Sequence, residues 1–273
     1  MILGNSRNVS APVAPFSPPV GAERVIAHRG FSGRYPENTR SAFDAAWNSG
    51  ARVLETDVQV TADGVAIVFH DARLDRLTDL EGTPADYSFA ELQRAVVRGP
   101  EGTVGGIMQM ADLLGSFPNA QFIVDLKDER AIEPLAKAIV TTNSAPRVCV
   151  THAWDAWLEG VREIVGPELQ RGLGWETMAA LVNAARRGVA PDPAIRVGNY
   201  AHIGWQIAGV KQAADQQFFR RYVDMAHDLG VAVRVWTINS PRQMARLFDD
   251  GADAIFTDHV DVGLRVVAEK FGL

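Results

Sequence analysis

Polar side chains end several short apolar runs in this sequence, at positions where a core would take further apolar residues. The run Val25–Ala27 ends in His28 and Arg29. A second run, VAIVF, ends in His70 and Asp71. An imidazole accepts and donates a proton near neutral pH, so histidines at such places are suited to acid/base work. These positions therefore indicate a functional site rather than packing.

Three carboxylates extend this pattern. Glu55 and Asp57 stand two residues apart in the run Val53–Val60, so their side chains point to the same face of a strand. Two carboxylates forced into an interior repel each other unless a cation or a proton lies between them. A hard divalent ion with oxygen ligands is the simplest remedy. Asp125 and Lys127 repeat the spacing and add a third carboxylate and an ammonium group.

The elements that must position these residues alternate along the chain from residue 24 onward. Several apolar runs have no polar face, which suits parallel strands covered by helices. The predicted strands are Val25–Ala27, Val53–Val60, Gln121–Leu126, Val148–Thr151, Leu169–Leu173, Ile195–Val197, Ala232–Thr237 and Ala254–Thr257. The predicted helices are Thr39–Ser49, Ala131–Thr141, Asp155–Val165, Thr177–Arg187, Asp215–Leu229, Pro241–Asp249 and Val262–Phe271. Close to eight strand–helix pairs predict an α/β fold, a (β/α)₈ TIM barrel.

The polar residues can be interpreted as solvated or salt-bridged side chains or as parts of one functional site. A barrel brings the carboxyl ends of its strands to one mouth, which bears on this choice. Taken alone, a Glu-x-Asp pair is more often on a solvated face or in a salt bridge, and Lys127 could simply be exposed. The set favours a functional site, because at least six polar groups fall on predicted strand ends that a barrel gathers.

The domain organisation follows from the same alternation. Residues 1–23 are rich in Pro and Ser and are expected to form an extended or disordered arm, and residues 24–273 a single barrel domain. The unit after the second strand is longer than the others. It predicts an insertion at about residues 72–119, with helices near Ser88–Val97 and Met110–Ser116.

Composition limits the partners. The net charge of −6 argues against nucleic acid, and no stretch has the roughly 18 apolar residues of a membrane span. No signal peptide is predicted, so a cytoplasmic enzyme is expected, with its oligomeric state left open. The single cysteine, Cys149, excludes an intramolecular disulfide and is expected to be a buried thiol.

Three blocks of sequence resemble the glycerophosphodiester phosphodiesterase family: AHRGFSGRYPENTRSAFDAA, GARVLETDVQVTADGVAIVFHDARLDRLTD and VWTINSPRQMARLFDDGADAIFTD. The resemblance runs from about Val25 to the C-terminus. It implies a TIM barrel with a small insertion that uses one divalent ion, Mg²⁺ or Ca²⁺, to hydrolyse glycerophosphodiesters to glycerol 3-phosphate and an alcohol. It further implies that the neighbouring glycerol hydroxyl is the first nucleophile.

The resemblance also implies roles for particular residues. These are the acid/base pair His28 and His70, the metal ligands Glu55, Asp57 and Asp125, and the phosphate contacts Arg29 and Lys127. Glu37 is implied as support of the metal site or of the structure. Asn38 is expected to cap the first helix. Trp236 is expected either to wall the pocket for glycerol or alcohol or to pack in the barrel core.

Some features depart from the family pattern and leave alternatives open. Asp125 stands where the family usually has Glu, and His152 stands where Ser is common, facing either the mouth or the core. A phosphodiesterase directed at lysophospholipids is an alternative, with an acyl groove formed by Leu74, Leu77, Leu80, Tyr87 and Phe89. A catalytically inactive barrel kept as a scaffold is a further one, disfavoured because both histidines and three carboxylates are present.

Overall fold

Parallel strands form the centre of the molecule in this computed structural model, which describes residues 19–191, 198–207 and 209–272. The barrel strands are β1 (Val25–Ala27), β2 (Val53–Val60), β6 (Gln121–Leu126), β7 (Val148–Thr151), β8 (Gln170–Arg171), β9 (Tyr200–Gly204), β12 (Ala232–Trp236) and β13 (Ala254–Thr257). In these ranges they pair in the order β8-β7-β6-β2-β1-β13-β12-β9, all in parallel. A bridge between Gly172 and Tyr200 joins the two ends of this order. The sheet therefore nearly closes, and the predicted TIM barrel is confirmed.

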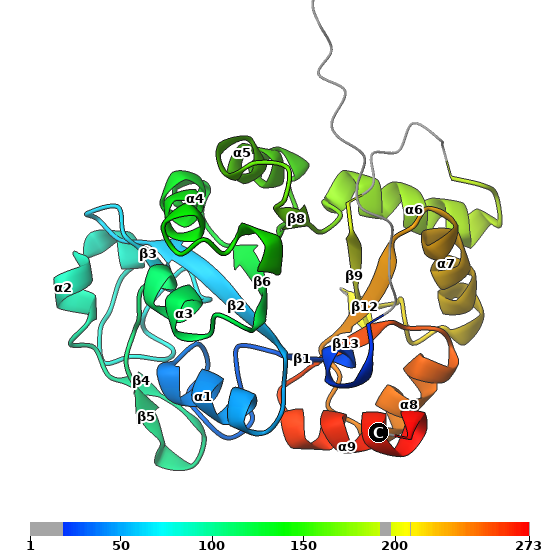
Figure 1. Ribbon diagram of the computed structural model, residues 1–273, viewed down its shortest axis with the longest axis horizontal. Coiled ribbons are helices and arrows are strands. Elements are labelled where there is room, and N and C mark those ends of the chain that lie inside the picture. The colour runs from blue at the N-terminus through cyan, green and yellow to red at the C-terminus, as the bar shows by residue number, and fades with distance from the viewer. Residues whose placement is uncertain (1–18, 192–197, 208, 273) are drawn as a thin grey trace, which may run out of the picture.

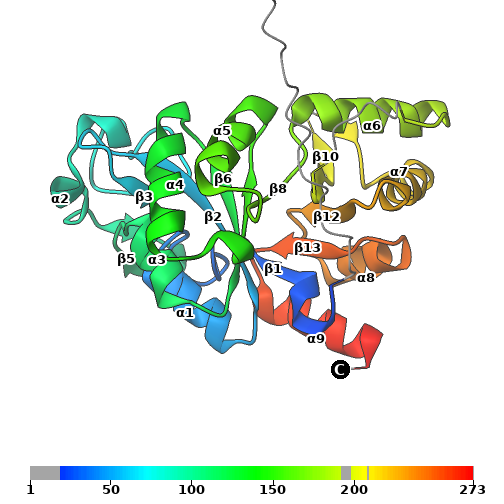
Figure 2. The same ribbon diagram turned by 45° about the horizontal axis from the view of Figure 1, so that its top comes forward.

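Helices cover the outside of the barrel. They are α1 (Arg40–Asn48), α3 (Met110–Ser116), α4 (Ile132–Thr141), α5 (Asp155–Val165), α6 (Trp175–Arg187), α7 (Gln216–Asp228), α8 (Pro241–Asp249) and α9 (Val260–Phe271). Helices α1, α3, α4 and α5 surround one half of the barrel and α6 to α9 the other (Figures 1 and 2). Short 3₁₀ turns lie at Gly21–Arg24, Pro84–Asp86, Pro100–Gly102, Glu129–Ala131 and Ala145–Arg147.

Alternation along β2 explains how a buried strand can carry charged side chains. Leu54 and Val58 pack outward in the cluster between strands and helices, while Val53 packs inside the barrel. Because side chains alternate along a strand, Glu55 and Asp57 share the inward face with Val53. The strand is thus apolar toward the helices and acidic toward the barrel mouth.

The segment between β2 and α3 forms a separate layer at one side of the barrel. Strand β3 (Ala66–Val68) pairs antiparallel with β2, and a hairpin of β4 (Val97–Arg98) and β5 (Val104–Gly105) follows α2 (Phe89–Leu92). This segment lies far from α6–α9 in both views (Figures 1 and 2). The helix predicted near Ser88–Val97 is one turn, because Val97 already pairs with Gly105 in the hairpin.

Two further predictions about elements differ from the structure. The predicted strand Ile195–Val197 lies outside the described residues, and the strand that pairs with β12 is β9, which the sequence analysis missed. The cap of α1 is Thr39, whose side chain accepts from the backbone N of Ala42, so the prediction of Asn38 as the cap is wrong. Asn38 is instead held by side chains of β2, as described below.

A short hairpin of β10 (Gln206–Ile207) and β11 (Val210–Lys211) follows β9. No helix in the described ranges is both long enough and apolar enough to cross a membrane.

Candidate active site

A cavity of about 550 Å³ opens at the carboxyl ends of the barrel strands. All eight predicted site residues line it: His28, Arg29, Glu55, Asp57, His70, Asp125, Lys127 and Trp236. They lie on β2, β6 and β12 or follow β1, β3 and β6 within two residues. The sequence prediction that one barrel mouth gathers these side chains is therefore confirmed, although their roles stay predictions.

The backbone after β1 turns sharply, which explains the His-Arg-Gly order. Arg29 has a left-handed conformation with φ of 54°, and Gly30 follows with φ of 79°. A Cβ on Gly30 would lie 2.7 Å from the backbone carbon of Ala42, so only glycine fits there. The turn lets the backbone N of Arg29 donate to Glu55 Oε2 at 2.9 Å.

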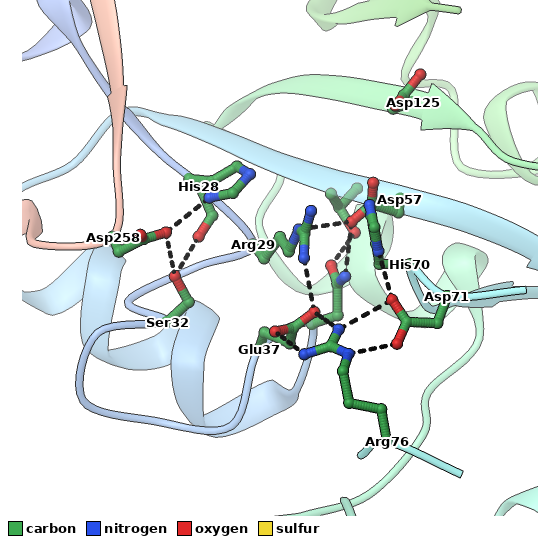
Figure 3. A network of polar contacts seen from close by, with 12 residues as sticks. His28, Arg29, Ser32, Glu37, Asp57, His70, Asp71, Arg76, Asp125 and Asp258 are labelled. Atoms are coloured by element: carbon green, nitrogen blue, oxygen red, sulfur yellow. Dashed lines mark hydrogen bonds and ion pairs between the residues drawn. The ribbon is translucent and has the colours of Figure 1, made fainter. Parts of the chain in front are cut away.

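His28 is oriented by a carboxylate from the last barrel strand. Its Nδ1 lies 2.6 Å from Asp258 Oδ1, and the same oxygen accepts from Ser32 Oγ at 2.9 Å (Figure 3). The other oxygen, Asp258 Oδ2, accepts from Asn239 Nδ2 at 2.7 Å. Burial would raise the pKa of Asp258, but the hydrogen bond from His28 and those from Asn239 and Ser32 hold it well below its usual range. An ionised carboxylate only accepts, so Nδ1 of His28 carries the proton and Nε2 is left for chemistry.

His70 is oriented in the same way by its neighbour. Its Nδ1 lies 2.6 Å from Asp71 Oδ1 (Figure 3). Hydrogen bonds from Arg76 are the main reason that the pKa of Asp71 falls to about 2, so Asp71 is ionised and Nδ1 of His70 donates. Burial lowers the pKa of His70 itself, and Asp57 and Asp71 offset this only in part.

For His28 the balance has the opposite sign. Burial lowers its pKa, but the charge of Glu55 and the hydrogen bond to Asp258 outweigh burial and raise the pKa above its usual value. The two histidines therefore differ in their readiness to carry a proton at neutral pH.

Arg76 joins the surroundings of His70 to those of Arg29. Its guanidinium binds Asp71 through Nε and Nη2, the latter at 2.9 Å from Oδ1. The same Nη2 lies 2.9 Å from Glu37 Oε1, and that oxygen accepts from Arg29 Nη1 at 2.8 Å. Figure 3 shows this chain of contacts from Asp71 through Arg76 and Glu37 to Arg29. Glu37 therefore supports the structure by pairing with Arg29 and Arg76, and its implied support of a metal site stays a prediction.

Asp57 is the most heavily compensated carboxylate. It lies 3.1 Å from Lys127 Nζ and 3.2 Å from Arg29 Nε, and it accepts from Asn38 Nδ2 at 2.8 Å. Asn38 is fixed in turn by Thr56 Oγ1 at 2.9 Å. Burial would raise the pKa of Asp57, but Lys127 and Arg29 hold it below its usual value.

Glu55 and Asp125 are less well compensated. Burial and the nearby Asp57 raise the pKa of Glu55 to about 7. Burial likewise raises the pKa of Asp125 to about 6, although Lys127 Nζ lies 2.5 Å from its Oδ2. The protein thus leaves part of the negative charge in this cavity without a partner.

These three carboxylates are suitable ligands for a divalent cation that binds oxygen atoms. Glu55, Asp57 and Asp125 offer only carboxylate oxygens, the ligands that Mg²⁺ and Ca²⁺ take. As the side chains stand, no three potential ligands among the described residues are grouped around one point. Lys127 Nζ contacts both Asp57 and Asp125, so an ion and this ammonium group would compete for the same carboxylates.

The other wall of the cavity is apolar and formed mainly by α6 and the barrel strands beside it. Its lining includes Leu173, Trp175, Met178, Ala179, Val182, Ile203, Trp236 and Phe256. Trp236 is 40% exposed, with its Nε1 donating to the backbone O of His202 at 3.1 Å, so it walls the cavity and does not fill the core.

His152 also faces the mouth, which settles an alternative left open by the sequence. It lines the cavity and stacks on Trp157 with ring centres 4.1 Å apart. Its Nδ1 accepts from the backbone N of Trp154 at 3.0 Å. Burial lowers its pKa to about 4, so the ring is neutral at pH 7.

The structure does not support the alternative of an acyl groove formed by apolar residues of the insertion. Leu74, Leu77 and Phe89 are buried, and Leu80 and Tyr87 pack against them in a cluster that belongs to the insertion. These side chains pack on one another within the inserted layer, and none of them lines the active-site cavity. The apolar surface at the site comes from α6 instead.

Sequence reasoning missed Asp258, Ser32, Asn239 and Arg76 as partners of the site. Asp258 directly follows β13, so the strand-end rule that found His28 could have found it. Arg76 lies in an irregular segment of the insertion, and nothing in its local sequence indicates that it reaches Glu37.

Comparisons with known proteins agree with this geometry. A family model described as "Glycerophosphoryl diester phosphodiesterase family" matches residues 28–262. A glycerophosphodiester phosphodiesterase of Caldanaerobacter subterraneus subsp. tengcongensis is 29% identical over 263 residues, covering 89% of this chain and 97% of that protein. A glycerophosphodiester phosphodiesterase of Bacillus altitudinis is 27% identical over 261 residues, covering 90% of this chain and 98% of that protein.

Solved structures show the same fold. A phosphodiesterase of Oleispira antarctica, solved in complex with the product sn-glycerol-3-phosphate, superposes with a TM-score of 0.69 at 23% identity. The superposition covers 89% of this chain and 96% of that one.

Proposed function

Because this chain belongs to the glycerophosphoryl diester phosphodiesterase family, we propose that it hydrolyses glycerophosphodiesters to glycerol 3-phosphate and an alcohol by acid/base catalysis. The observation that carries the proposal is the meeting of two carboxylate-oriented histidines with Arg29 and Lys127 in one cavity. The names of the relatives support the substrate class, as does the product bound to the Oleispira antarctica enzyme.

Charge neutralisation is the first requirement of the reaction, since a phosphodiester anion repels nucleophiles. Arg29 and Lys127 are both positively charged and line the cavity, so they are placed to contact the phosphate oxygens. Glu55, Asp57 and Asp125 would hold one Mg²⁺ or Ca²⁺ ion. When bound, such an ion supplies further positive charge to the phosphoryl group.

The histidines divide the proton transfers. The lowered pKa of His70 suits a base that takes the proton of the attacking oxygen, and the raised pKa of His28 suits an acid that protonates the leaving alcohol. The attacking oxygen is the neighbouring hydroxyl of the glycerol, giving a cyclic phosphate that water then opens. A substrate methylated at that hydroxyl should bind without turnover, and normal turnover would mean that water attacks directly.

A panel of glycerophosphodiesters, assayed after chelation and after return of Mg²⁺, Ca²⁺ or Mn²⁺, tests the function. We expect release of glycerol 3-phosphate that depends on the ion. His28→Ala and His70→Ala should each lower kcat by about 10²–10⁴ with little change in Tm. Absence of activity on every diester would overturn the proposal, and wild-type turnover in either variant would remove that histidine from it.

A second candidate is a phosphodiesterase that acts on lysophospholipids through the same site. The observation that favours it is the apolar cavity wall on α6, where Met178, Ala179 and Val182 are only half-buried. Val182→Asp should then lower kcat/KM for lysophosphatidylcholine about tenfold or more relative to glycerophosphocholine, since a carboxylate would meet the chain. Val140→Asp, an exposed valine on α4, is the matched control and should leave this ratio unchanged.

The small-molecule substrate is the partner proposed for this site. A cytoplasmic location stays a prediction from the sequence.

A further inference from the structure

A second cavity, of about 250 Å³, lies at the opposite end of the barrel from the active site. Its lining includes the first residues of four barrel strands, Val53, Gln121, Gln170 and Tyr200. The amino ends of these strands mark the face away from the catalytic mouth. One apolar cluster inside the barrel contains Ile123, which lines this cavity, and Phe256, which lines the active-site cavity.

Arg234 is the unusual residue of this cavity. It stands on β12 two residues before Trp236, so both side chains point into the barrel. It is only 6% exposed, yet it makes no ion pair with any residue in the described ranges. Its guanidinium carbon lies 3.4 Å from the centre of the Tyr200 ring, and its Nε has no hydrogen-bond partner. An unpaired charge held inside a protein is strongly unfavourable.

Two acidic groups near this cavity, Asp253 and Glu23, are already engaged. Asp253 accepts from His227 Nε2 at 2.8 Å and from the backbone N of Val233 at 2.7 Å. Glu23 accepts from Gln121 Nε2 at 3.3 Å at the edge of the cavity. None of the described residues that line the cavity is Asp or Glu. Burial lowers the pKa of Arg234 below its usual value, and the nearby Tyr200, Cys149 and Asp253 offset this only in part.

Further donors surround the same space. Arg147 lines the cavity and adds a second positive charge, its guanidinium bound to the backbone O of Phe117, Ala120 and Leu114 at 3.1, 3.2 and 2.6 Å. Tyr200 Oη donates to Gln170 Oε1 at 2.8 Å, which leaves the amide nitrogen of Gln170 to donate elsewhere. Among the described residues, the cavity lining thus combines two arginines and an amide donor with no carboxylate.

We infer that the cavity around Arg234 is a binding site for a small oxyanion, separate from the active site. The planar guanidinium of arginine matches the paired oxygens of phosphate and of carboxylates, so both share the chemistry that this site recognises. The bound anion would supply the charge partner that Arg234 lacks. Its effect would be to stabilise the barrel, and it takes no part in the reaction.

Thermal unfolding with inorganic phosphate as the probe tests the inference. Chloride at equal ionic strength is the control, and acetate replaces phosphate in a parallel series to compare the two oxyanions. We expect the Tm of the wild-type protein to rise by about 5 °C or more at phosphate about 100 times its Kd. Arg234→Met should lose this rise. Without phosphate its Tm should equal or exceed that of the wild type, because an unpaired buried charge has been removed.

Two further variants locate the anion. Arg29→Gln weakens phosphate binding at the active site and should keep the rise in Tm. Arg234→Lys keeps the charge but loses the paired donors, so its Kd for phosphate by calorimetry should rise about tenfold. If Arg234→Met does not fold, Arg234→Lys still tests whether phosphate binds at Arg234. No rise in the wild type, the same rise in Arg234→Met, or loss of the rise in Arg29→Gln would overturn the inference. None of these readouts depends on turnover, so failure here is distinct from failure of the proposed activity.

Discussion

Replacement of Arg76 by methionine tests whether a residue outside the cavity lining acts on catalysis through the groups it contacts. Arg76 binds Asp71, which orients His70, and Glu37, which orients Arg29. Methionine keeps much of the side-chain length but removes every one of these donors. Both the base and the phosphate contact would then lose part of their orientation, although neither is itself altered.

The size of the effect follows from what Arg76 touches and how exposed it is. Partners that orient catalytic groups from behind are typically worth about 10–100-fold in activity, or about 1.4–2.7 kcal/mol. The Arg76 side chain is 51% exposed, so solvent screens its ion pairs and their contribution to folding should stay below about 1 kcal/mol. For a chain of this size the fall in Tm should therefore not exceed about 2–4 °C.

Steady-state kinetics and thermal unfolding are measured together for Arg76→Met and two companions. Arg73→Met is the matched control, because Arg73 lies in the same segment, is also exposed, and pairs with Asp75. It should show wild-type kinetics. Arg76→Lys should recover part of the activity, since the charge returns without the paired donors. We expect kcat to fall in Arg76→Met through His70 and KM to rise through Arg29.

Two results would refute this reasoning. One is a loss of less than about threefold in kcat/KM, which is too small for loss of orientation at two groups. The other is an equal loss in Arg73→Met, which would mean that any change of charge on the insertion has the same effect.

Three further predictions concern other parts of the structure. Asp258→Asn should lower kcat by about 10²–10⁴, because an amide no longer fixes the tautomer of His28, and a wild-type kcat would show that Asp258 does not position it. Asp125→Asn should need far more Mg²⁺ or Ca²⁺ for half-maximal activity while Asp125→Glu stays active, and an unchanged metal titration in Asp125→Asn would exclude Asp125 as a ligand. Burial raises the pKa of Cys149 to about 12, so its thiol should react with Ellman's reagent only after unfolding in urea. Rapid labelling of the native protein would contradict this.

Most of the barrel could be predicted because each strand carries its own signal. All eight residues of β2 are buried, and such a run predicts a strand covered on both sides. The strand β9 was missed because YAHIG mixes a glycine and a histidine with few β-branched residues. Its place in the sheet comes from pairing with β12 rather than from local preference.

Site residues that lie close together in the sequence could be predicted, and pairs that lie far apart in it could not. Glu55 and Asp57 were found because their relation is local, two residues apart on one strand. The pair His28 and Asp258 is separated by 230 residues, and only closure of the barrel brings the two side chains to 2.6 Å. The leucines of the insertion illustrate a different limit, because apolar side chains that pack on each other and those that line a groove have the same sequence pattern.

The alternation of side chains along a strand tells which of them face the barrel interior, but it does not tell which end of the barrel they reach. Arg234 and Trp236 face the barrel interior by the same spacing that places Glu55 and Asp57 there. Trp236 is the last residue of β12 and reaches the catalytic cavity, while Arg234 lies one inward position deeper and lines the cavity at the other end. An inward charge in a barrel strand therefore indicates a polar site, and its distance from the carboxyl end of the strand decides which of the two faces that site serves.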